Sequence, residues 1–283
     1  VIIRITYMRF FIAFILTLTC LPSFAMADIV RDIPYGTLER EKLDIYTPDN
    51  AQNLPVMIYI HGGGWAIGNK KRVQTKPEAF SEVGYIFVSV GYPLLPKHPV
   101  ETQAQSIANA ISWIQNNIKN YDGDPERIHL MGHSAGAHLV ALIATDHSYL
   151  KKVNASIHDI QSVISIDGAA MNLVWRMNNL YRSKSERIFT NAFGTNKTRW
   201  EKLCPYHQAT SDEYIPDFLF LTAQNRKDSN ITAKDFHSKL QTLDVHSVVS
   251  PIADRDHSTI NRLMGTKNDE AFAQIMDFLN QKD

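Results

Sequence analysis

The stretch that decides the fold is IHLMGHSAGAHLVALIATD, residues 128–146. An apolar run of strand length ends at Gly132, Ser134 stands between two glycines, and an apolar run of helical length follows. So short a turn between a buried strand and a helix is typical of a nucleophile elbow, which lifts a serine hydroxyl above the edge of a sheet. G-x-S-x-G also occurs by chance, so the rest of the chain has to support this interpretation.

Composition and charge exclude several classes of partner. The chain has 283 residues, of which 44% are hydrophobic and 20% charged, as in an ordinary globular protein. Lys plus Arg and Asp plus Glu number 29 each, so the formal net charge is zero. A neutral chain lacks the basic footprint of a nucleic-acid-binding or membrane-surface protein. We therefore expect a small-molecule partner and no nucleic acid; nothing in the sequence indicates the oligomeric state.

The N-terminal residues have the order of parts found in a secretory signal. MRFFIAFILTLTCLPSFAMA, residues 8–27, places a charged start before an apolar segment and a small-residue site at 25–27. We expect residues 1–27 to be a signal peptide removed before Asp28, with 1–7 upstream of the true start. The apolar segment is too short to span a bilayer comfortably, so a membrane anchor is the less favoured alternative. The sequence thus predicts a secreted or periplasmic protein.

The cysteines predict neither a disulfide nor a metal framework. Cys20 leaves with the signal peptide, so the mature chain holds only Cys204. One cysteine cannot form an intramolecular disulfide or a cysteine-based metal site. No metal and no cofactor are expected.

Apolar runs of strand length alternate with segments of helical period from Asp28 onward. The predicted strands lie at 41–48, 56–61, 85–92, 128–132, 162–168, 217–223 and 246–252, and the predicted helices after 134 and at 107–118, 231–244 and 268–280. Continuous apolar strands separated by helices predict an α/β domain, a mostly parallel central sheet with helices on both faces. We expect one domain over 28–283. The segment 169–215 lacks a clear period and indicates a small inserted cap.

A serine nucleophile needs a base to take its proton and a third group to orient that base. His257 is the predicted base because it directly follows the last strand and so lies at the edge where parallel strands end. Asp228 is the predicted acid because it follows the strand at 217–223 and preserves the order Ser, Asp, His. Asp254 and Asp256 are too near His257 along the chain, and Asp212 and Asp217 precede the strand.

HGGGW, residues 61–65, directly follows the predicted strand VMIYI. Three consecutive glycines destabilise regular structure unless backbone must approach something closely. The backbone N–H groups of Gly63, Gly64 and Ala135 are therefore predicted to stabilise an oxyanion. Trp65 and His133, which adjoin the two glycine motifs, are the predicted substrate-binding side chains.

HGGGWAIGNKKR, GYIFVSVGYPLLP, GDPERIHLMGHSAGAHLVAL and DRDHSTINRL resemble the α/β-hydrolase superfamily, specifically its esterase/lipase group with HGGGW and GxSxG. Within that group the chain is similar to the branch with GHSAG, which includes carboxylesterases, feruloyl-esterase-like enzymes and kynurenine formamidases. The resemblance covers roughly residues 42–283 and implies a cofactor-free Ser-His-Asp hydrolase. One departure is TAQNRKD, which lacks the glycine that the family usually has before its acid.

The sequence therefore predicts a serine esterase that cleaves a small carboxylic ester through an acyl-enzyme intermediate. Two alternatives stay open. The same residues could cleave an N-formyl amide such as formylkynurenine, or a peptide. A non-catalytic binding protein of the same fold is disfavoured, because the serine and histidine are both present. The acyl and alcohol parts of the substrate are not specified by the sequence.

Overall fold

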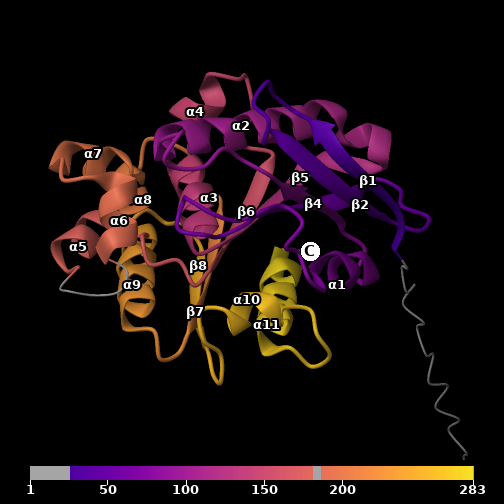
Figure 1. The fold of residues 1–283 in the computed structure, drawn as a ribbon. Helices are drawn as coiled ribbons and strands as arrows, with labels where there is room; N and C mark the ends of the chain where they lie inside the picture. The colour runs from indigo at the N-terminus through magenta and orange to yellow at the C-terminus, as the bar shows by residue number, and fades with distance from the viewer. Residues whose placement is uncertain (1–25, 181–185, 283) are drawn as a thin grey trace, which may run out of the picture.

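The computed structural model describes residues 26–180 and 186–282, and an eight-stranded sheet forms its centre (Figure 1). The strand order is β1-β2-β4-β3-β5-β6-β7-β8. The strands are β1 (Met26–Pro34), β2 (Lys42–Pro48), β3 (Leu54–Ile60), β4 (Ile86–Val90), β5 (Gly123–His133), β6 (Ile160–Ile166), β7 (Asp217–Ala223) and β8 (Ser247–Ile252). Strand β2 pairs antiparallel with both of its neighbours, β1 and β4. Each of the remaining neighbouring pairs, from β4–β3 to β7–β8 in the strand order, is parallel. The predicted mostly parallel sheet is confirmed.

The helices cover both faces of the sheet. They are α1 (Lys76–Glu82), α2 (Val100–Asn117), α3 (Ala135–Thr145), α4 (Ser148–Lys151), α5 (Leu173–Asn178), α6 (Glu186–Phe193), α7 (Lys197–Lys202), α8 (Pro205–Gln208), α9 (Lys227–Gln241), α10 (Thr259–Arg262) and α11 (Glu270–Leu279), with 3-10 turns η1 (Ile118–Tyr121) and η2 (Asn280–Lys282). Alternate strand residues point to opposite faces. Ile58 packs in one cluster with α2, α3 and α9, while its neighbour Met57 packs in a second cluster with α1 and α11. Two buried faces explain the continuously apolar strands.

The described parts of the segment 169–215, residues 169–180 and 186–215, contain short helices. Helices α5 to α8 gather on one side of the molecule, in orange tones in Figure 1. Helix α8 contacts α3 and α9, so the group rests on the helical layer beside the sheet. Phe193 and Trp200 are buried there. The sequence missed these helices because each spans only one or two turns, which is too short for a helical period to show.

The N-terminal end of the predicted domain differs from the structure in detail. Strand β1 was not expected, and its first two residues, 26 and 27, belong to the predicted signal peptide. The rest of that predicted segment lies outside the described residues. Within residues 26–180 and 186–282, no helix combines the length and apolar character needed to cross a bilayer.

Candidate active site

Ser134 sits at the turn between β5 and α3. Its φ of 56° and ψ of −113° fall in a region that residues with a side chain rarely adopt, so the local backbone is strained. Strain of this kind persists only where the surroundings enforce it. Gly136 shows how tight those surroundings are, because a Cβ atom there would lie 2.1 Å from the carbonyl oxygen of Ile60 on β3. The second glycine of the motif therefore lets α3 begin directly against the sheet.

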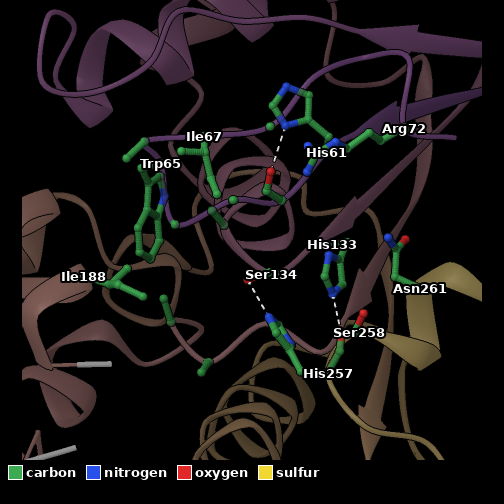
Figure 2. Close-up of a pocket in the computed structure, with 18 of the residues that line it drawn as sticks. His61, Trp65, Ile67, Arg72, His133, Ser134, Ile188, His257, Ser258 and Asn261 are labelled. Carbon is green, nitrogen blue, oxygen red and sulfur yellow. Dashed lines mark hydrogen bonds between the residues drawn. The ribbon is translucent and has the colours of Figure 1, made fainter. Parts of the chain in front are cut away.

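His257 lies in the loop after β8 and reaches Ser134. Its Nε2 atom is 3.0 Å from the Ser134 Oγ atom, a hydrogen bond drawn as a dashed line in Figure 2. The imidazole is 39% exposed, so one side of it is open to a ligand. The structure thus brings together the two residues that the sequence predicted as nucleophile and base, although 123 positions separate them.

The carboxylate at His257 belongs to Asp167, which directly follows β6. Its Oδ2 atom accepts a hydrogen bond from His257 Nδ1 at 2.7 Å, and its Oδ1 atom accepts one from the Ala223 N–H at 3.2 Å. The side chain is fully buried. Burial alone would raise its pKa, but the hydrogen bond from His257 and the charge of Arg226 outweigh burial and hold the pKa of Asp167 well below its ordinary value. Asp167 is therefore an anion at neutral pH.

Arg226, in the loop after β7, clamps this carboxylate. Its Nη1 atom donates to the Oδ2 atom of Asp167 at 2.7 Å and to the backbone oxygen of Asp167 at 3.1 Å. The same Nη1 atom also touches the Nδ1 atom of His257. Since the histidine nitrogen donates to the carboxylate, it cannot also accept, so we assign the Arg226 proton to Asp167.

The placement predicted for Asp228 was wrong. Asp228 lies in the first turn of α9, where its carboxylate is 38% exposed and pairs with the Arg176 Nη2 atom at 3.0 Å. Helix α9 begins at Lys227, so it carries Asp228 away from the end of β7 toward α5. A usable signal was nonetheless present, because Asp167 ends the buried run SVISID and also satisfies the order Ser, Asp, His.

The predicted oxyanion donors line the cavity beside Ser134. Among the described residues, no hydrogen bond occupies the backbone N–H groups of Gly63, Gly64 or Ala135. Gly63 has a φ of 133°, and a Cβ atom there would lie 1.9 Å from the carbonyl oxygen of Ile67. Only glycine fits that position, so the loop can bring free N–H groups close to the serine.

The two predicted substrate-binding side chains occupy different places. The His133 Nε2–H group donates to the backbone oxygen of His257 at 2.8 Å, and the two rings lie 4.6 Å apart. Burial, followed by the charge of His257, lowers the pKa of His133 to about 3, so it supports His257 as a neutral ring. Trp65 is only 3% exposed, yet it lines the cavity while packing edge-on against Phe189 and Phe193.

A cavity of about 1060 Å³ opens over Ser134 and His257. It exposes the serine, the imidazole and the free N–H groups to one common volume, large enough for a drug-sized molecule. In the part of the chain that the structure describes, no group of three or more His, Cys, Asp or Glu side chains could hold a metal ion. The arrangement can activate a hydroxyl, hold a developing oxyanion and return a proton to a leaving group.

Comparisons with known proteins bear on the family and the fold of this chain. Residues 43–249 match the family model BD-FAE. A probable isoprenylcysteine alpha-carbonyl methylesterase, ICMEL1, of Oryza sativa subsp. japonica is 32% identical over 171 residues, which cover 56% of this chain and 40% of that protein. Esterase LipQ of Mycobacterium tuberculosis (strain ATCC 25618 / H37Rv) is 44% identical over 129 residues, or 44% and 30% of the two chains. Kynurenine formamidase of Danio rerio is 28% identical over 151 residues, half of each chain.

The alignments therefore span half or less of each of these curated relatives. Among solved structures, esterase B from Lactobacillus Rhamnosis (HN001) superposes on this chain with a TM-score of 0.73 at 17% sequence identity. The superposition covers 90% of this chain and 84% of the esterase B chain. At that identity the likeness concerns the fold alone. The predicted α/β-hydrolase fold and esterase/lipase resemblance are confirmed.

Proposed function

The chain belongs to the BD-FAE family, and from this membership we propose that it is a carboxylic ester hydrolase with Ser134 as its nucleophile. The observation that carries the proposal is an unbroken chain of hydrogen bonds. Ser134 Oγ is 3.0 Å from His257 Nε2, and His257 Nδ1 is 2.7 Å from the Asp167 carboxylate. The Ser134 end of this series of hydrogen bonds faces a cavity that is lined by residues with unoccupied backbone N–H groups. The methylesterase and esterase relatives support ester cleavage over other reactions.

In the acylation step, the Ser134 oxygen attacks the ester carbonyl carbon while His257 Nε2 takes the hydroxyl proton. The carbonyl electron pair moves to oxygen, where the N–H groups of Gly63, Gly64 and Ala135 stabilise the negative charge. The imidazolium gives its proton to the leaving alcohol oxygen as the C–O bond breaks. The buried Asp167 anion stabilises the imidazolium and keeps the Nδ1 proton in place.

Deacylation repeats these steps with water. The water oxygen attacks the acyl carbon while His257 removes a proton from the water. The Ser134 oxygen then leaves the acyl carbon and takes that proton from His257. The products are a carboxylic acid and an alcohol. The strained backbone at Ser134 keeps its side chain above the sheet edge, so both attacks occur in the same open volume.

Cleavage of an N-formyl amide is the second candidate, favoured by the similarity to kynurenine formamidase. The same residues would act, with an amine in place of the alcohol. Relative kcat/KM values for a series of 4-nitrophenyl esters and for N-formylkynurenine decide between the two. We expect esters to be the better substrates, and a higher kcat/KM for the formyl amide than for every ester would overturn that order.

The proposal is tested by a fluorophosphonate probe, which labels only an activated serine. We expect the probe to label Ser134, and we expect Ser134→Ala to abolish this labelling. The same variant should lower ester turnover about a million-fold if the three residues act as a unit. Ser211→Ala, at an exposed loop position, is the matched control and should retain full activity. Turnover that survives Ser134→Ala within tenfold would exclude the mechanism.

A further inference from the structure

The cavity has two unlike sides. In Figure 2, Trp65, Ile67 and Ile188 lie on one side of Ser134, and Arg72 and Asn261 lie on the other. Ile67 and Ile188 are 65% and 46% exposed, which is unusual for large aliphatic side chains and leaves them available to an apolar group. We call this side the apolar arm.

The opposite side, the basic arm, is polar and positively charged. It contains Arg72, from the loop after β3, together with Asn261 and Arg262 from α10. No aspartate or glutamate is among the described residues that line the cavity. The charge of Arg226, the remaining arginine of the lining, is balanced by Asp167. The other two arginines therefore give the cavity a positive potential.

Neither of these two arginine side chains is neutralised within residues 26–180 and 186–282. Arg72 and Arg262 form no ion pair and no side-chain hydrogen bond there. The charge of Arg262 contributes, as the smallest of several causes, to lowering the pKa of Asp256. The Oδ1 atom of Asp256 accepts hydrogen bonds from the N–H groups of Ser258 and Thr259 at 2.8 and 2.7 Å. That carboxylate is engaged by the loop of His257 and does not line the cavity. The two guanidinium groups are thus left available for a ligand.

We propose that the substrate is an ester that carries an anionic group, which the guanidinium groups of Arg72 and Arg262 bind while an apolar group of the substrate occupies the side of Trp65. The proposal rests on the proposed ester hydrolase function and specifies its substrate class. A planar guanidinium donates two parallel hydrogen bonds to a carboxylate or a phosphate, which fixes the orientation of the ligand as well as its charge. Binding at both arms would set the ester carbonyl over Ser134.

The test compares anionic esters with neutral esters of nearly the same shape. The carboxylate pairs are 4-acetoxybenzoate against 4-acetoxybenzamide, with the charge on the alcohol side, and monomethyl adipate against methyl adipamate, with the charge on the acyl side. A phosphate source is represented by 4-acetoxyphenyl phosphate. We expect kcat/KM for at least one anionic ester to exceed that of its neutral counterpart about tenfold, with the difference mainly in KM. The preference should fall as ionic strength rises, because salt screens exposed charges.

The variants Arg72→Gln and Arg262→Gln should each reduce this preference severalfold, and together abolish it, because kcat/KM falls for the anionic esters by more than it falls for their neutral counterparts. Lys71→Gln is the matched control, because it removes the same charge one residue away on an exposed side chain that does not line this cavity. It should leave the preference unchanged.

Equal kcat/KM values for charged and neutral esters, or a preference that survives in the double variant, would overturn the proposal. In that case Ser134-dependent hydrolysis of the neutral esters would show that the hydrolase function stands without it. If no ester is hydrolysed and Ser134 is not labelled by the fluorophosphonate, the proposed function fails and the substrate class fails with it.

Discussion

The change Asp167→Asn tests the reassigned acid most directly, because it removes one charge and preserves shape. The carboxylate is fully buried and bonded to His257 at 2.7 Å, so water cannot replace it. The new amide can donate its N–H to Nδ1, which favours the imidazole tautomer with the proton on Nε2. That tautomer cannot accept the Ser134 proton. By analogy with such changes in other triads, we expect kcat to fall about 10³- to 10⁴-fold, or about 4 to 5.5 kcal/mol in barrier height.

The assay is the release of 4-nitrophenol from 4-nitrophenyl acetate, supported by the rate of fluorophosphonate labelling. Asp228→Asn is the matched control, since it makes the same chemical change at the residue that the sequence favoured. Its activity should stay within about threefold of wild type, because Asp228 contacts Arg176 and not His257. Its thermal midpoint should fall, because the buried Arg176 loses the ion pair with Asp228.

The reasoning is refuted if the two variants exchange behaviour, so that Asp228→Asn loses a thousandfold and Asp167→Asn stays near wild type. It is equally refuted if Asp167→Asn retains the native fold by circular dichroism and loses less than tenfold in kcat. The fold of the Asp167→Asn variant must be checked, because Asp167 also accepts hydrogen bonds from Ala223 and Arg226 that hold the surrounding loops.

Three further perturbations have defined outcomes. Gly63→Ala places a Cβ atom 1.9 Å from the Ile67 carbonyl oxygen, so the loop must shift and kcat should fall at least about a hundredfold; an unchanged kcat would exclude this loop as the oxyanion site. Burial lowers the pKa of Lys76 from 10.5 to about 7, so between these pH values the unfolded chain binds more protons than the folded chain. The free energy of unfolding therefore rises with pH over this range. Urea titrations at pH 7 and pH 10 should show this rise in the wild type and not in Lys76→Met. Arg226→Met removes a charge that lowers the pKa of Asp167. The stability that comes from this low pKa is present above about pH 4 and is lost as the pH falls. The midpoint of acid unfolding, measured by fluorescence, should therefore move to higher pH in the variant.

The sequence predicts Ser134 and His257 because each is fixed by a local signal at a strand end. The glycines beside Ser134 are required by close contact with β3, and His257 follows the last strand of a parallel sheet. Parallel strands end at one edge, so residues that follow different strands meet there. Gly63 and Gly64 follow a third strand and are predicted for the same reason.

The order of the residues along the chain does not by itself decide between Asp167 and Asp228 as the acid. The order Ser, Asp, His is satisfied equally by the loop after β6 and by the loop after β7. Which loop reaches His257 depends on where α9 begins, and a helix start is among the least reliable features of sequence-based prediction. Helix α2 shows a related error: it begins at Val100, seven residues before the predicted start, because Gln103 and Ser106 are buried polar residues that break the apolar period. Gln103 is buried to donate to the Trp65 carbonyl oxygen at 2.9 Å.

The loop after β7 contributes a cation where the sequence predicted an anion, and this changes the charge balance of the site. At rest, Asp167 and Arg226 neutralise each other beside His257. When His257 takes the serine proton, the three groups together carry one positive charge, which the oxyanion of the tetrahedral intermediate balances. The catalytic centre therefore supplies no lasting negative charge that would repel an anionic substrate. An ester with a negative group can thus approach Arg72 without an opposing field from the acid, because the arginine that clamps Asp167 already cancels it.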